Sequence, residues 1–303
     1  MPRPALRVLI ASDGSYRHPG GPTPIDFLSR WFMPVCTVVQ VVSERRAVDD
    51  ARESLRQLVT EWGLSPESRR LVVESSNVAR GLVLATQRGP CDLMITHSPL
   101  PLARRRARFA SVRGDLLAHV PVPLWSWNAA VPLPMQPPSI AAVADWAAAP
   151  ASALRTAAAV AGRTGGRLQV ACRLSQMDDA LMADASQDYM PTSLEMAASA
   201  LEAVGVTALA SPVLRVLGSG TRALHRWCMD VRPDLLVVAT PDALTWRRQF
   251  DEALHKHAAV VLCVDDRSAA SPFVAGLLAN TTCLDDDHRC ADRPQRREQT
   301  GCL

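Results

Sequence analysis

The sequence predicts an α/β protein made of two tandem, doubly wound, parallel sheets of five strands each. Three observations support this prediction. Short apolar runs alternate along the chain with amphipathic segments, this order of elements occurs twice, and an uncharged proline-rich segment separates the two occurrences. We therefore divide the chain into a first domain (residues 1–127), a linker (128–138), a second domain (139–265) and a polar tail that we expect to be disordered (266–303).

The first half opens on a short apolar strand that ends at the turn signal Asp13-Gly14-Ser15. The first clear helix has apolar residues three and four positions apart and stops before Gly63. Asn77 is a good N-cap for the next helix, which Gly89-Pro90 ends. The expected strands are 6–12, 35–42, 71–73, 92–96 and 122–127, and the expected helices are 47–62, 77–88 and 111–119.

The second half repeats this order. Its first strand ends at Asp145, as the first strand of the chain ends at Asp13. Sliding the halves together superimposes Asp92 on Asp234 and, without a gap, Arg80 on Arg222, so an internal duplication is indicated even though few side chains match. The expected strands are 139–144, 167–174, 213–217, 234–240 and 260–264, and the expected helices are 151–161, 193–204 and 222–230.

Composition excludes few classes of partner. The formal net charge of +3 and the pI near 8.5 are too mild to require nucleic acid or an anionic membrane. The longest uncharged stretch, residues 116–144, carries six prolines, so we expect no transmembrane helix. Several cysteines lie in apolar runs and no C-x-x-C pair occurs, which favours a cytoplasmic location.

Three stretches resemble the universal stress protein family. They are Val8-Leu-Ile-Ala-Ser-Asp-Gly-Ser15, Asp92-Leu-Met-Ile-Thr-His-Ser98, and Ala110-Ser-Val112 ahead of Leu116-Leu-Ala-His-Val-Pro-Val-Pro123. The resemblance covers residues 6–264 as a tandem arrangement and implies the Rossmann-like fold of that family, which is related to that of the adenine nucleotide alpha hydrolases. Family members that bind ATP have an aspartate after the first strand and a loop of the form G-x-x-G, eight to ten residues, G-[ST].

By this resemblance, Asp13 with Gly14 and Ser15 would lie near the nucleoside and Val41 near the base. His97 and Ser98 would begin the phosphate loop, and Ser111 with Val112 would end it. Ser98, Pro101 and Ala110 stand where the family has glycine, and glycine is what lets backbone approach phosphate closely. The resemblance therefore implies an ATP cradle that is degenerate in the first half, and the second half has no glycine at all in the corresponding loop.

Two features keep alternative interpretations. Asp13 is either a ligand residue at the carboxyl end of its strand or a cap of the following turn. The arginines in the loop, among them Arg104, Arg105 and Arg106, either replace the lost backbone donors or form ordinary solvated surface. If they bind something, a polyanion or an acidic protein face fits as well as ATP or AMP.

The sequence favours a protein that is not an enzyme and holds no cofactor or metal. His97 and Ser111 lack a third catalytic group, no G-x-S-x-G elbow occurs, and the cysteines and histidine of the tail have no recognised zinc spacing. Trp125 and Trp127 point to one face of their strand and are either ordinary core or part of a contact. In the family the final strand forms the dimer contact, so residues 122–127 and 260–264 are expected to pair as an internal pseudo-dimer.

The function we expect is a non-catalytic, regulatory role in stress with weak or absent ATP binding, exercised on a protein partner, as a homodimer, or on an altered ligand. The alternative is a working adenine-nucleotide binder that uses Arg104–Arg106 in place of the glycines. Neither interpretation includes a membrane or a specific nucleic acid as partner.

Overall fold

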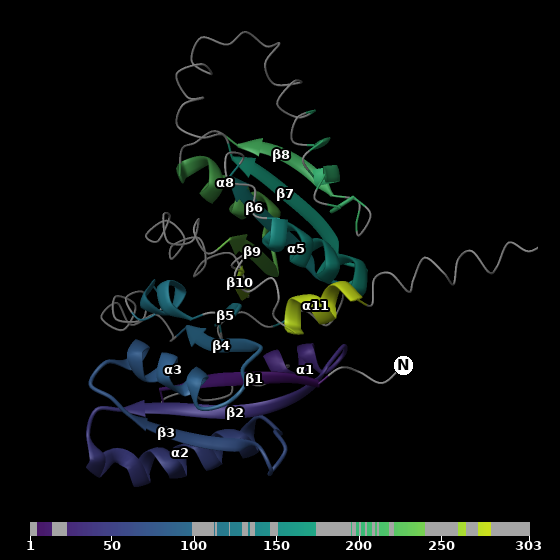
Figure 1. Ribbon diagram of the computed structural model, residues 1–303. Helices are drawn as coiled ribbons and strands as arrows, with labels where there is room; N and C mark the ends of the chain where they lie inside the picture. Colours follow the sequence, from purple (N-terminus) through teal and green to yellow (C-terminus); the bar gives the residue numbers. More distant parts are fainter. Residues whose placement is uncertain are drawn as a thin grey trace, which may run out of the picture.

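The computed structural model is a long, twisted sheet with helices on both faces (Figure 1). It describes residues 5–13, 23–98, 112, 114–120, 122–128, 133, 137–145, 151–173, 195, 198–199, 201–203, 205–207, 210, 212–217, 221–239, 260–264 and 272–279. In the first half, the elements are β1 (Ala5–Ser12), α1 (Pro24–Leu28), β2 (Met33–Val42), the 3-10 turn η1 (Arg45–Ala47), α2 (Val48–Glu61), β3 (Arg69–Glu74), α3 (Val78–Gln87), β4 (Leu93–Ser98) and β5 (Leu124–Asn128).

The second half repeats the alternation of strand and helix. Its elements are β6 (Ser139–Asp145), α5 (Ala151–Thr164), β7 (Arg167–Arg173), β8 (Val213–Leu217), α8 (Thr221–Val231), β9 (Leu235–Ala239), β10 (Val260–Val264) and α11 (Pro272–Ala279). All ten predicted strands are present, which confirms the predicted α/β class with doubly wound strand order.

The two five-stranded units join into one sheet. The strand order is β3-β2-β1-β4-β5-β10-β9-β6-β7-β8, and adjacent strands run parallel except β5 and β10, which are antiparallel. The predicted pairing of residues 122–127 with 260–264 is therefore confirmed. Each half has the same internal order, and the second half is reversed relative to the first.

The strand pairing relates the two halves by an approximate two-fold axis, which passes between Trp125 and Leu262. Met94 lies opposite Leu124 in the first half, and the equivalent pair in the second half is Leu236 and Val261. Trp125 and Leu262 are thus equivalent positions, and they face each other across the junction. Each half presents its last strand to the other in the same way.

Each face of the sheet buries its own apolar cluster. The α2 face is covered by α1, α2, α5 and α11, and the α3 face is covered by α3, by the helical residues 114–119 and by α8. Parallel strands buried on both faces explain why the strands are almost continuous apolar runs in the sequence. The outer strand β3 carries charge instead, at Arg69, Arg70 and Glu74, which discourages pairing with another sheet.

Aromatic side chains fill the α2 face beside the junction. Trp125 and Trp127 are each 2% exposed. The ring of Trp125 lies 5.7 Å from that of Phe27, and the ring of Trp127 lies 5.7 Å from that of Trp62. The two tryptophans are therefore core residues, as the simpler interpretation held, and they lie in one of the paired strands.

Within the described residues, two α-helices were not predicted from the sequence. Helix α1 has a capping box, in which Thr23 Oγ1 accepts from Asp26 N–H at 3.1 Å and Asp26 Oδ2 accepts from Thr23 N–H at 2.7 Å. Helix α11 lies within the expected disordered tail, so that expectation is wrong for Pro272–Ala279. Phe273 is 1% exposed and its ring lies 5.8 Å from that of Phe32, and α11 also contacts α5 (Figure 1).

The expected linker is also partly structured. Asn128 is the last residue of β5, and Leu133 and Pro138 are buried. Leu133 belongs to the cluster on the α2 face. The proline-rich composition predicted a spacer, and the structure places Leu133 and Pro138 beside residues of both halves near the junction.

We expect Phe273→Ala to lower the free energy of unfolding by about 3–5 kcal/mol, because the substitution leaves a cavity between α11 and the first half of the chain. Urea denaturation followed by circular dichroism measures this loss. Ala275→Ser is the matched control, since Ala275 is exposed on the same helix, and it should change stability by less than about 0.5 kcal/mol. Equal stability of the two variants would show that α11 is not docked.

Candidate functional site

The topology places a reversal of strand order beside β1, and we call this position the first crevice. In the sheet, β2 and β3 lie on one side of β1, and β4 and β5 lie on the other side. Loops at the carboxyl ends of β1 and β4 therefore leave toward opposite faces, and such a switch point is where doubly wound sheets bind ligands. The same reversal occurs between β6 and β9 in the second half.

The register brings three predicted site residues into one row at this crevice. Ser12 lies opposite Gln40, so the next residues in line are Asp13 and Val41. Ala11 lies opposite Thr96, and extending this register by two residues brings Asp13 alongside Ser98. Ser98 in turn pairs with Asn128. The row therefore runs Val41, Asp13, Ser98, Asn128 along the carboxyl edge of the first half.

The other predicted residues divide into two groups. His97 is the penultimate residue of β4, and Val112 is a half-buried helical residue packed against the α3 face. Asp13 itself is exposed directly after β1. Five predictions lie outside the described residues: Gly14, Ser15, Arg104, Arg105 and Ser111. The structure thus gives the backbone positions of the strand-borne candidates, and the role of every candidate in binding stays a prediction.

Val41 is held by a close contact with α3. A Cβ added at Gly81 would lie 2.6 Å from Val41 Cγ1 and 2.9 Å from Cγ2, so only glycine permits this approach of helix to strand. The helix begins where predicted, because Asn77 Oδ1 accepts from Arg80 N–H at 2.9 Å. Together the cap and the glycine fix α3 against the wall of the crevice, and sequence reasoning had not assigned Gly81 this role.

The second crevice differs at the matching row. Asp145 ends β6, as Asp13 follows β1, and its backbone lies opposite Arg173 of β7. Arg173 occupies the position that Val41 holds in the first half, because Val8 pairs with Cys36 as Ile140 pairs with Leu168. Arg173 was not singled out from the sequence. Its position, next to the strand-ending aspartate, becomes visible only through the register.

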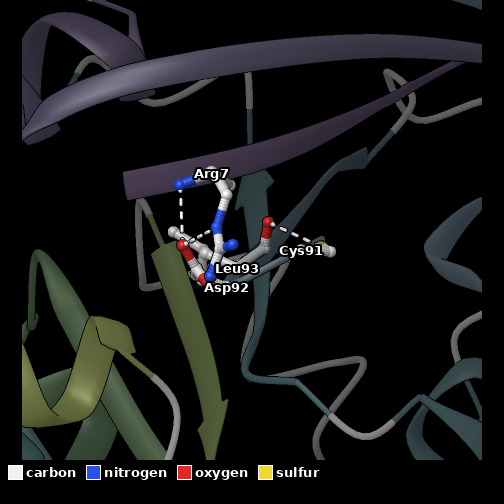
Figure 2. Close-up of polar contacts among 4 residues, drawn as sticks. All are labelled: Arg7, Cys91, Asp92 and Leu93. Carbon is white, nitrogen blue, oxygen red and sulfur yellow. Dashed lines mark hydrogen bonds and ion pairs between the residues drawn. The ribbon is translucent and has the colours of Figure 1, made fainter. Parts of the chain in front are cut away.

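Arg7 and Asp92 form an ion pair at the other end of these strands (Figure 2). Arg7 Nη2 donates to Asp92 Oδ1 at 2.7 Å, and both Nε and the backbone N–H of Arg7 donate to Oδ2 at 2.9 Å. Hydrogen bonding to Asp92 and its charge raise the pKa of Arg7. The Asp92 side chain is 2% exposed and needs these donors to remain buried.

Asp234 makes the equivalent backbone contact in the second half. Its Oδ2 accepts from Ser139 N–H at 2.7 Å, and its own N–H donates to Ser139 O at 2.8 Å. Asp92 N–H likewise donates to Arg7 O at 2.8 Å. The superposition of Asp92 on Asp234 from the sequence therefore corresponds to one structural role, in which an aspartate ties the start of β4 or β9 to β1 or β6.

A cavity of about 750 Å³ opens near the Arg7–Asp92 pair, at the amino ends of β1, β2 and β3. It lies at the opposite end of these strands from the row of Asp13. Two free cysteines, Cys36 and Cys91, are in its lining. Cys91 Sγ donates to Leu93 O at 3.5 Å (Figure 2). Sequence reasoning did not find this cavity.

Burial suppresses the acidity of three thiols. Desolvation raises the pKa of Cys36, Cys91 and Cys228 from 9.0 to about 12. A thiol with such a pKa is neutral at physiological pH and is a poor nucleophile or metal ligand. Among the residues described, no group of three or more histidine, cysteine or acidic side chains could hold a metal ion.

Comparison with known proteins establishes the fold. A protein named provisionally as a universal stress protein from Pseudomonas aeruginosa superimposes with a TM-score of 0.55 at 14% identity, over 92% of this chain and 97% of that one. A universal stress protein from Archaeoglobus fulgidus gives 0.55 at 13%, over 86% and 96%. A second Pseudomonas aeruginosa protein, of unknown function, gives 0.57 at 13%, over 91% and 97%.

These likenesses extend through both halves of the sheet, and the fold is that of universal stress proteins. No family model matches the sequence, and no curated protein matches it either. In the part of the chain that the structure describes, every helix is too short or too polar to cross a membrane.

We expect Gly81→Ala to destabilise the fold by about 1–3 kcal/mol, because the added methyl group would overlap Val41. The double variant Gly81→Ala with Val41→Ala removes the overlap. A double-mutant cycle measured by urea denaturation should then show a coupling of at least about 0.5 kcal/mol that favours the double variant. Simple additivity of the two substitutions would contradict this packing of α3.

Alkaline pH should destabilise the protein through its buried thiols. Their stabilising contribution is complete below pH 9 and is lost as pH rises toward 12, because the unfolded chain releases these protons first. Each thiol adds a slope of up to about 1.4 kcal/mol per pH unit. One lysine, two tyrosines and five further cysteines also titrate in this range, so a variant that lacks only these three thiols is needed to isolate their effect.

The measurement is urea denaturation between pH 8 and 11 with reductant present. The triple variant Cys36→Ala, Cys91→Ala, Cys228→Ala should lose much of the pH dependence, whatever its absolute stability. An unchanged slope in the triple variant would exclude the thiols as the cause.

Proposed function

We propose that this chain is a non-catalytic regulatory protein of the universal stress protein type, made of two such units in tandem (residues 1–127 and 139–265). It acts in the cytoplasm during stress by binding a protein partner or an altered ligand, and it binds ATP weakly or not at all. The two units form an internal pseudo-dimer. We place no membrane and no specific nucleic acid among its partners.

The observation that supports the tandem interpretation is the mirrored strand order about the β5–β10 junction. Two separate proteins of this fold meeting at their last strands would give the same order. The equivalent contacts of Asp92 and Asp234 point the same way, because each residue ties corresponding strands together through the same backbone bonds.

The row at the first crevice supports a retained but altered binding site. Asp13 follows β1 at the switch point, where the family resemblance places the nucleoside, and Val41 and Ser98 lie near the ends of the neighbouring strands β2 and β4. The loop that follows β4 carries Pro101 and Ala110 in place of glycines, so it offers fewer backbone donors to a phosphate chain. In the second crevice an arginine position replaces Val41, so the two crevices differ in chemistry.

The non-catalytic part of the proposal rests on residue types. A nucleophile needs a base within hydrogen-bond reach and a group that orients that base. The sequence supplies no such third group for His97 and Ser111 and no nucleophile elbow. By residue type, the row contains one carboxylate, one hydroxyl and one amide, which suits ligand binding.

Calorimetry with ATP, AMP and cyclic AMP tests the proposal. We expect dissociation constants of about 1 mM or weaker for the wild type, which corresponds to about −4 kcal/mol. Micromolar ATP binding that Asp13→Ala abolishes and Asp145→Ala spares would refute the proposal. If charge reversal at Arg104, Arg105 and Arg106 abolishes it as well, the alternative of an arginine-based nucleotide site is correct.

A further inference from the structure

The cavity at the amino ends of β1, β2 and β3 has a floor that the strand register defines. Ala5 lies opposite Met33, Arg7 opposite Val35, and Thr37 opposite Arg69. These residues alternate with the ones that face α2, so they lie on the α3 face. The floor thus consists of apolar β2 side chains with one arginine on each flanking strand.

Helix α3 leaves this floor uncovered. The helix packs over the middle of the strands through Ala79, Leu82 and Ala85, which belong to the same cluster as Val39. The helix ends at Gln87. On the same face of β2, Thr37 is half-buried, and the two side chains closer to the amino end of the strand are exposed. Val35 is 57% exposed and Met33 is 56% exposed. On the α3 face, the first side chains of β2 are therefore more than half exposed to solvent.

Exposure of this pair requires an explanation. Single exposed apolar residues are normal on protein surfaces. Met33 and Val35 instead lie next to each other on one face of one strand, and both line the same cavity. The cavity also extends to the α2 face, where Ile25, Phe32 and Trp62 line it, and its whole volume of about 750 Å³ lies within the range of about 300–1,000 Å³ that is typical of small-molecule sites.

The two flanking arginines are held in place. Asp92 fixes the guanidinium of Arg7 through two bonds, yet 44% of the Arg7 side chain remains exposed. Arg69 Nη1 donates to Arg88 O, the carbonyl at the end of α3, at 3.3 Å. Positioned guanidinium groups bind carboxylates with little loss of side-chain entropy.

The lining also contains two acidic residues, Asp26 and Glu67, which do not pair with Arg7 or Arg69. Asp26 is engaged on the α2 face by Thr23, whose hydroxyl and backbone N–H both donate to it. Glu67 lies in the loop between α2 and β3 and is exposed. The carbonyl end of α3 has a partial negative charge that disfavours anions, but Arg69 donates a charged hydrogen bond to the carbonyl of Arg88 at this end.

We propose that this cavity binds a small amphipathic carboxylate, whose apolar body lies on Met33 and Val35 and whose carboxylate meets Arg7 and Arg69. The site is separate from the crevice at Asp13, since the two lie at opposite ends of β1. A protein segment with apolar and acidic side chains would be the competing occupant, but a hollow of this volume between two positioned arginines suits a small molecule better.

Calorimetric titration with decanoate, below its micelle concentration, tests the proposal on the full chain. We expect saturable binding that ATP does not displace. Val35→Glu and Arg69→Gln should each weaken it by about tenfold or more, through loss of apolar contact and of a charged hydrogen bond respectively. Arg69 and Arg70 are adjacent on β3 but point to opposite faces, so Arg70→Gln is the matched control and should leave the affinity unchanged.

A second control separates the site from general surface effects. Met229 on α8 is 47% exposed, and Met229→Glu should not alter decanoate binding. Absence of saturable binding, equal effects of Arg69→Gln and Arg70→Gln, or equal affinity for decanol and decanoate would each overturn the proposal. Displacement of decanoate by a short acidic-apolar peptide of much higher affinity would assign the cavity to a protein partner and overturn it as well.

Discussion

The antiparallel pairing of β5 with β10 is the constraint on which the rest of the structure depends. Without this pairing each half would end in an apolar strand with unpaired backbone groups, and such an edge promotes aggregation. The pairing also sets the position of the aromatic core, because Trp125 and Trp127 project from β5 onto the α2 face beside α1 and α2. The outer strands of the joined sheet can then be short and charged, as β3 is.

The fold follows from the sequence wherever burial on both faces produces apolar runs. Each strand was predicted to within a few residues for this reason, as was helix α3 with its cap at Asn77. Helix α1 was missed although Thr23-Pro24-Ile25-Asp26 holds its capping box, because five residues show no helical periodicity. Helix α11 was missed because its apolar run is only eight residues long and lies within a segment that is otherwise polar.

The candidate site was predictable only in part. Strand-ending residues such as Asp13 and Val41 can be placed by order along the chain, since parallel strands bring their ends together. Contacts between residues at the amino ends of the strands cannot be predicted from the order of elements in this way. Arg7 looks like a surface charge in the sequence, and only the structure shows that it satisfies buried Asp92. The antiparallel junction also makes the two halves run in opposite directions, so their crevices open at opposite edges of the joined sheet and have to be considered separately.

The position of β10 late in the sequence has a consequence during synthesis. The first half leaves the ribosome complete, with both tryptophans of β5 in place, but the partner strand is made only after nearly all of the second half. At about 5–20 residues per second, β5 lacks its partner strand for about 7–27 seconds. We therefore expect newly made chains to need a chaperone that covers β5 until translation has finished.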